Sequence, residues 1–215
     1  CIGHGYKVGI VQFIKGTWDC GERNVMENMP GCEFHVMGTG FTWETQDPFL
    51  FCAYHRDQYP MGNSQMGVNH EALKGRNIGQ DFNKKDGWSM YHGSKIPGFP
   101  YHPHRGFETI TINKEGVVDH SDSLGAAGRF MAGDVQWMTA GSGIVHQEMP
   151  KENKGKLSGF QLWVNLPASH KMMNPRYQDI QSKDIPEVEW KGIPVRVIAG
   201  SFEKVEGPVK GIVTK

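Results

Sequence analysis

The sequence has no excess of charge of either sign, because its 215 residues hold 23 Lys and Arg against 23 Asp and Glu. Proteins that hold nucleic acid by its phosphates need an excess of basic side chains. The charge balance therefore argues against direct nucleic-acid binding. It leaves open an uncharged protein that docks onto a DNA-binding protein.

Closely spaced cysteines and long apolar runs are also missing. The four cysteines, Cys1, Cys20, Cys32 and Cys52, show no C-x-x-C spacing, so we expect the reduced, unpaired thiols of an intracellular protein. No apolar run approaches membrane-spanning length, and no signal peptide is visible. We therefore expect no membrane association and a cytoplasmic location, with the nucleus as the alternative in a eukaryote.

Long amphipathic segments are scarce, whereas glycine and proline are abundant. The 28 glycines and 12 prolines separate short apolar runs, a pattern typical of many strands joined by turns. The sequence therefore predicts an all-β fold.

Two short segments each carry a pair of side chains that can bind a metal. In an extended strand, residues two apart point to the same face, so His102 shares a face with His104, and His146 with Glu148. Pro103 favours an extended backbone at the first pair. Two such pairs facing each other would form a site of three imidazoles and one carboxylate.

This set of ligands contains no thiolate. Imidazole and carboxylate suit Fe, Mn, Ni, Cu or Zn, and a closed structural zinc site would more usually contain cysteine. Four protein ligands on a six-coordinate ion leave positions for water, substrate or dioxygen. The ligand set alone leaves Fe, Mn, Ni, Cu and Zn open.

Three motifs around these residues resemble the pirin family of the cupin superfamily. They are PGFPYHPHRGFET at residues 97–109, GDVQWMTAG at 133–141 and GIVHQEMP at 143–150. The resemblance extends from about residue 47 to residue 200. It implies a double-stranded β-helix barrel, and it implies that His102, His104, His146 and Glu148 bind a metal, commonly iron. On this resemblance we expect Fe²⁺, with Mn, Ni, Cu and Zn as alternatives.

Glu108 is an alternative to Glu148. Counting by twos from His102 and His104 places Glu108 on the ligand face, and many other cupins use a Glu at this spacing. Pirins take the carboxylate from the second segment. We therefore prefer Glu148 and keep Glu108 as an alternative ligand or a residue supporting the ligands.

Residues 1–47 have a different character, with strand patterns over 7–16 and 33–38. They resemble an internal piece of the ATP:corrinoid adenosyltransferases, in which the positions of Phe41 and Trp43 lie against the corrinoid. The G-x-x-x-x-G-K-[ST] phosphate-binding loop of that family is absent from the 215 residues. We therefore do not propose nucleotide binding, and we expect Phe41 and Trp43 to be packing residues. The segment is a fused or misassigned piece, or it replaces the leading strands of a pirin.

Three parts follow from these resemblances. Residues 1–47 are an adenosyltransferase-like fragment or leading strands, 48–170 are a pirin-like cupin domain, and 171–215 are a connection and the truncated start of a second cupin domain. Because most of that second domain is missing, we expect its partner surface to be exposed or covered by another copy of the chain.

A long polar, glycine-rich insertion spans residues 59–95, with a helical turn expected at 71–74. We expect it to cover the mouth of the barrel. Ordinary hydrogen-bonding roles are expected for His70 and His92 in this insertion, and a solvated or hydrogen-bonded role for His120 and Asp122.

Two functions fit these observations best. The first is a metal-dependent dioxygenase, resembling quercetin 2,3-dioxygenase, that acts on a flavonol or other polyphenol with Glu148 as a catalytic proton acceptor. The second is a non-enzymatic iron protein whose oxidation state controls docking to a transcription regulator. A corrinoid adenosyltransferase fragment is a third, minor alternative that depends on the first 47 residues alone.

Overall fold

The computed structural model describes residues 10–13, 41–61, 67–95, 97–151 and 156–213. The chain divides into two compact units, residues 40–182 and residues 1–39 with 183–215. Each unit is described by itself. The division into 1–47, 48–170 and 171–215 follows sequence resemblance and stays a prediction.

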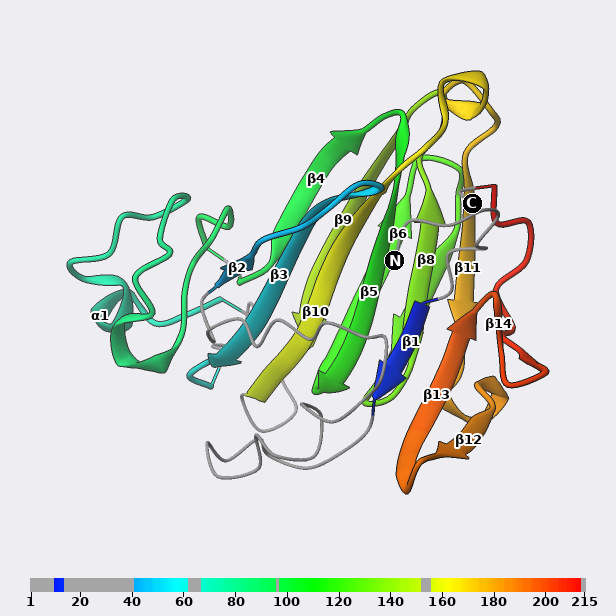
Figure 1. Ribbon diagram of the computed structural model, residues 1–215. Coiled ribbons are helices and arrows are strands. Elements are labelled where there is room, and N and C mark those ends of the chain that lie inside the picture. The colour runs from blue at the N-terminus through cyan, green and yellow to red at the C-terminus, as the bar shows by residue number, and fades with distance from the viewer. Residues whose placement is uncertain (1–9, 14–40, 62–66, 96, 152–155, 214–215) are drawn as a thin grey trace. The chain divides into compact units, whose positions relative to one another are not determined.

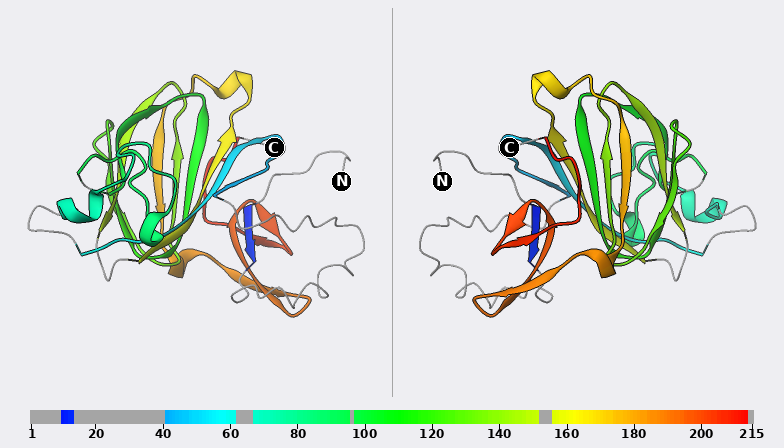
Figure 2. Two further views of the ribbon diagram at one scale, coloured as in Figure 1. Left: turned by 90° about the vertical axis from the view of Figure 1, so that its left-hand side faces the viewer. Right: turned by 90° about the vertical axis from the view of Figure 1, so that its right-hand side faces the viewer.

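The unit at residues 40–182 is built from two antiparallel sheets (Figures 1 and 2). Hydrogen bonds from Thr111 and Gln161 of one sheet to Glu148 of the other show that the sheets face each other. The six-stranded sheet has the order β11 (Arg176–Ile180), β8 (Val135–Thr139), β5 (Phe107–Glu115), β10 (Lys156–Asn165), β3 (Phe49–Gln58) and β2 (Thr42–Trp43). The four-stranded sheet has the order β4 (Phe99–His104), β9 (Ile144–Lys151), β6 (Val117–Asp122) and β7 (Ala127–Phe130).

The residue pattern of the strands explains which faces are buried. In β6, Val118, His120 and Asp122 are buried and alternate with partly exposed neighbours, as expected for a strand with one face toward a core. Strand β8, which lies between β11 and β5, is buried at every position. The predicted all-β, double-stranded β-helix barrel of the cupin type is confirmed.

Glycines form a turn at the end of β4 and a turn at the start of β9, the two strands that carry the ligand histidines. Gly141, with φ +50°, precedes β9, and a Cβ added there would collide with the backbone oxygen of Met173. Gly106, with φ +79°, separates β4 from β5. Both conformations are easy only for glycine.

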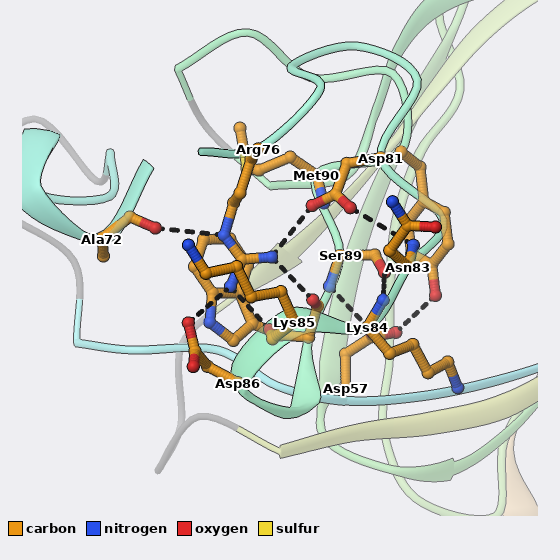
Figure 3. Close-up of polar contacts among 12 residues, drawn as sticks. Asp57, Ala72, Arg76, Asp81, Asn83, Lys84, Lys85, Asp86, Ser89 and Met90 are labelled. Atoms are coloured by element: carbon orange, nitrogen blue, oxygen red, sulfur yellow. Dashed lines mark hydrogen bonds and ion pairs between the residues drawn. The ribbon is translucent and has the colours of Figure 1, made fainter. Parts of the chain in front are cut away.

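The insertion contains one short helix, α1 (His70–Leu73), and one 3₁₀ turn, η2 (Lys85–Gly87). The helical turn expected at 71–74 is thus present one residue earlier. The side chain of Arg76 is buried and donates to Asp81 Oδ2 at 2.9 Å, and its guanidinium lies 3.5 Å from the ring centre of Trp88 (Figure 3).

The insertion is tied to β3 by Asp57. This carboxylate accepts hydrogen bonds from Ser89 N at 3.0 Å and Tyr91 Oη at 2.9 Å. The apolar side chains of Tyr59, Val68, Trp88 and Met90 form a buried cluster beneath the loop. The part of the insertion that the structure describes is therefore folded and packs against β3.

The second unit contains a sheet of three strands, β1 (Ile10–Phe13), β13 (Ile193–Ala199) and β12 (Glu187–Trp190), and the pair β14 (Ser201–Phe202) and β15 (Val205–Glu206). The strand predicted over 7–16 is present at β1. The strand predicted over 33–38 lies outside the described residues.

Two short 3₁₀ turns, η3 (Ala168–His170) and η4 (Ser182–Asp184), complete the described elements. None of the helices described is long and apolar enough to cross a membrane. Cys52 is a free, buried thiol, and Cys1, Cys20 and Cys32 lie outside the described residues.

Candidate metal centre

Neighbouring strands β4 and β9 bring three histidines together. His102 pairs with His146 across the antiparallel ladder, and His104 lies two residues further along the same face of β4. One ring nitrogen from each of the three lies within 4.8 Å of the others. The ring centres are 4.7 Å apart for His102 and His104, and 4.5 Å apart for His102 and His146. These separations are compatible with a shared metal ion.

Hydrogen bonding and burial indicate which ring nitrogens are available to a metal. His102 Nδ1 lies 2.7 Å from the carbonyl oxygen of Pro100, which can only accept, so Nδ1 carries the proton and Nε2 is the bare nitrogen. His104 Nε2 and His146 Nε2 are buried and have no hydrogen-bond partner among the described residues. Buried nitrogens without partners are costly unless a ligand satisfies them. Two such nitrogens next to the bare Nε2 of His102 fit a metal ion.

Burial keeps the three imidazoles neutral. It lowers the pKa of His104 to about 4 and that of His146 to about 2, and the neighbouring imidazoles add to both shifts. Burial also lowers the pKa of His102. At neutral pH the rings therefore offer lone pairs, as metal binding requires.

Two residues of β6, His120 and Asp122, form a hydrogen-bonded chain that ends at Nδ1 of His146. His120 Nδ1 lies 3.4 Å from His146 Nδ1, and His120 Nε2 lies 3.1 Å from Asp122 Oδ2. Because the carboxylate only accepts, His120 Nε2 carries a proton and His120 Nδ1 is an acceptor. His146 Nδ1 then donates, which leaves His146 Nε2 free for a metal.

The expectation of a hydrogen-bonded role for His120 and Asp122 is confirmed, whereas a solvated role is wrong for both. Both side chains are buried, and the His120 ring stacks on Tyr177 with centres 4.2 Å apart. The spacing of two residues was the available signal in the sequence. It did not show that β6 pairs with β9 and places Asp122 opposite His146.

Glu148 lies on the same strand as His146 but outside the histidine cluster. Its Oε1 accepts from Thr111 Oγ1 at 3.0 Å, and its Oε2 accepts from Gln161 Nε2 at 2.9 Å. Burial raises the pKa of the carboxyl group, and the two hydrogen bonds oppose this shift. Its role as a fourth ligand stays a prediction.

Glu108 faces away from the histidines, which corrects the count by twos along the sequence. The turn at Gly106 shifts the phase of alternation by one residue, so Phe107 packs on His104 and Thr111 reaches Glu148. Glu108 lies on the other face, where its Oε1 accepts from Trp137 and Thr139. It is therefore neither a ligand nor a direct support for one.

A cleft adjoins the site inside the barrel. Its cavity volume is about 40 Å³, and the cleft is partly open to solvent. Glu148, Thr111 and Gln161 line it together with the aromatic rings of Phe99 and Phe160. His55 also lines it.

The remaining residues singled out from the sequence lie elsewhere. His70 is exposed on α1, and His92 is exposed with its ring 5.8 Å from that of Phe99. As expected, Phe41 and Trp43 pack on other rings, Phe41 on Tyr91 and Trp43 on Phe160.

Two family sequence models match parts of this chain. The sequence model of the family described as Pirin matches residues 33–164. The model of the ATP:corrinoid adenosyltransferase family matches residues 1–61, so the two matches overlap over 33–61.

Individual relatives point the same way. Pirin-like protein 2 of Arabidopsis thaliana is 53% identical over 112 residues, which are 52% of this chain and 34% of that protein. A pirin-like protein of Caulobacter vibrioides is 51% identical over 118 residues, 54% of this chain and 43% of the relative. The matched segment thus spans less than half of either relative.

A similar solved structure is the crystal structure of quercetin 2,3-dioxygenase from Acinetobacter baumannii. It is 35% identical with a TM-score of 0.56, and the match covers 77% of this chain and 49% of that one.

Proposed function

This chain belongs to the pirin family, and from that membership and its three clustered histidines we propose that it binds one metal ion and acts as a dioxygenase on a flavonol or related polyphenol. The observation that carries the proposal is the convergence of three neutral imidazoles whose Nε2 atoms are free. The structural similarity to a quercetin 2,3-dioxygenase supports the choice of substrate class.

His102, His104 and His146 would hold the ion, and Glu148 is the proposed fourth ligand. We favour Fe²⁺, although Mn, Ni, Cu and Zn accept the same ligands. When bound, such an ion supplies Lewis acidity and a route for electrons between substrate and dioxygen.

Glu148 is also the proposed proton acceptor. It lines the cleft and lies two residues from His146, so a substrate hydroxyl next to the metal site would be within reach of its carboxylate. Thr111 and Gln161 each donate one hydrogen bond and hold the carboxylate in place. The aromatic rings of Phe99 and Phe160 offer flat apolar surface to a polyphenol.

The test is oxygen uptake by iron-loaded protein mixed anaerobically with quercetin and then exposed to air. We expect uptake together with loss of quercetin, and a loss of about 10²-fold or more in rate for Glu148→Gln. His70→Ala, at an exposed histidine, is the control and should match the unmodified protein. Absence of uptake across several polyphenols, by protein that contains one iron per chain, would contradict the proposal.

A second candidate is an iron protein that docks onto a transcription regulator in one oxidation state. The observation that favours it is exposed apolar surface next to the ligands, since Tyr101 is 60% exposed and Val145 40% exposed, each adjacent in the chain to a ligand histidine. A docked protein on this surface could sense a change at the metal. The same surface could instead pack on a second copy of the chain.

This candidate is tested by binding of a purified regulator to the ferrous and ferric forms. Binding that differs between the two forms, and that Tyr101→Ser with Val145→Ser abolishes, would support it. Equal or negligible binding in both states would remove it.

A further inference from the structure

The side chain of His55, on β3, is buried without a polar partner. It is 8% exposed, and neither ring nitrogen has a hydrogen-bond partner among the described residues. An unpaired buried polar group is costly, so a native structure that keeps one calls for an explanation. Neither the metal site nor the proposed chemistry of Glu148 uses this residue.

Aromatic rings hold His55 in a defined orientation. Phe41, Tyr91 and Phe99 meet it edge to face, with ring centres at 5.1, 5.1 and 5.4 Å. Burial, with the Lys84 ammonium adding to it, lowers the pKa of His55 to about 4. At neutral pH the ring is thus uncharged and presents one N–H donor and one lone pair.

Hydrogen bonds hold the segment of the insertion that packs on His55 in place. Tyr91, which contacts His55, donates its hydroxyl hydrogen to Asp57, and Asp57 also accepts from the backbone of Ser89. Arg76 links two further points of the insertion, because its guanidinium donates hydrogen bonds to Asp81 and to the carbonyl oxygen of Trp88 (Figure 3). A ring placed by such a segment is preorganised to bind.

His55 and Glu148 line the same cleft, so a ligand bound there can contact both side chains. The carboxylate oxygens of Glu148 already accept hydrogen bonds from Thr111 and Gln161, whereas the nitrogens of His55 are free. A ligand with polar groups on opposite ends of a flat ring system could meet both residues. The lining ring of Phe99 also contacts both His55 and, at 6.5 Å between ring centres, His102.

We propose that His55 is a ligand-binding residue of this cleft, which exchanges a hydrogen bond with a hydroxyl or carbonyl group of a planar phenolic ligand while Glu148 lies at the metal end. This inference rests on the proposed function, since it specifies how the same site takes its substrate. A phenol suits the cleft because its hydroxyl can donate or accept, its ring packs on aromatic walls, and it carries no charge to desolvate.

The experiment measures equilibrium binding of quercetin to metal-free protein by titration calorimetry. His55→Phe keeps a flat ring against the aromatic neighbours and removes both nitrogens. His70→Phe makes the same replacement at an exposed histidine of α1. We expect His55→Phe to weaken binding by about tenfold, the usual effect of one lost hydrogen bond, and His70→Phe to leave it unchanged.

Equal binding by the unmodified protein and His55→Phe would overturn the role of His55 and leave the proposed function standing. Failure of the unmodified protein to bind quercetin, with or without iron, would overturn both. A second measurement needs no variant: the ¹⁵N shifts of the His55 ring in the unmodified protein should change on adding quercetin, and unchanged shifts at saturation would reject the contact.

Discussion

His120 and His146 approach each other through their Nδ1 atoms, at 3.4 Å, on the adjacent strands β6 and β9. Asp122 accepts a hydrogen bond from Nε2 of His120, so Nδ1 of His120 is an acceptor and Nδ1 of His146 is the donor to it. The three residues thus form one hydrogen-bonded chain. The chain leaves His146 Nε2 bare. It also fixes the ring orientation, as hydrogen bonds to the far nitrogen of a metal-binding histidine commonly do.

Removing this support should weaken metal binding without removing a ligand. We expect His120→Phe to lower the affinity for Fe²⁺ by about 10- to 100-fold, because His146 loses the acceptor that sets its tautomer. Competition with a chelator of known affinity measures the change. Asp119→Asn, at an exposed carboxylate on the same strand that pairs with Arg129, is the control and should leave affinity unchanged. An affinity for His120→Phe equal to that of the control would contradict the chain.

The stability of the metal-free protein should fall in acid partly through His55. Its folded pKa, lowered by burial to about 4, lies below the ordinary value of 6.5. The unfolded chain thus takes up a proton first, and stability present above pH 6.5 is lost as the pH falls toward 4. We expect this to amount to roughly 2 to 3 kcal/mol by about pH 4.5.

Urea unfolding of the protein and of His55→Phe at neutral pH and at about pH 4.5 measures this contribution. The variant should lose less stability between the two pH values. Burial raises the pKa of Asp57 to about 6, and this acts in the opposite direction, but it is common to both proteins. Equal losses would show that His55 is not buried as a neutral ring.

Arg76 should be essential for the order of the insertion. Its side chain is buried against Asp81 and stacked on Trp88. Arg76→Met keeps an aliphatic stem but removes the cationic partner of the buried Asp81 carboxylate, a change that typically costs about 3 to 5 kcal/mol. We expect faster hydrogen exchange and proteolysis across residues 67–95. Lys74→Ala breaks only the exposed pair with Glu71 and should have an effect of about 1 kcal/mol or less.

Gly141 should not tolerate a side chain. Gly141→Ala places a Cβ against the backbone oxygen of Met173 in a left-handed conformation, so the turn before β9 must shift. We expect a loss of at least about 1 kcal/mol in stability and weaker metal binding, because β9 carries His146. Gly125→Ala is the matched control, with a left-handed turn but open space around it. Similar metal affinity in the two variants would show that the Gly141 turn does not position His146.

The sequence was sufficient for those features that depend on local geometry. Residues two apart in a strand share a face wherever the strand lies, so the pair His102 and His104 was predictable, and Pro103 kept it extended. The all-β class was predictable from the short apolar runs separated by glycine and proline, and the barrel from the motifs that resemble pirins.

Features that depend on the conformation of a particular turn, or on pairing between distant strands, were not predictable from the residues. The shift of phase at Gly106, which turned Glu108 away, needs the backbone conformation of one turn. The support of His146 by His120 needs the register between β6 and β9. The burial of His55 arises only when the insertion folds against β3, which no local pattern shows.

Metal content is the most direct test of the central claim that His102, His104 and His146 share one ion. Protein incubated with Fe²⁺ under anaerobic conditions and freed of excess metal should contain one ion per chain by elemental analysis, as should the exposed control His70→Ala. His102→Ala and His146→Ala should contain almost none while keeping the strand content of the unmodified protein. One ion per chain in these two variants, or none in the unmodified protein, would contradict the account.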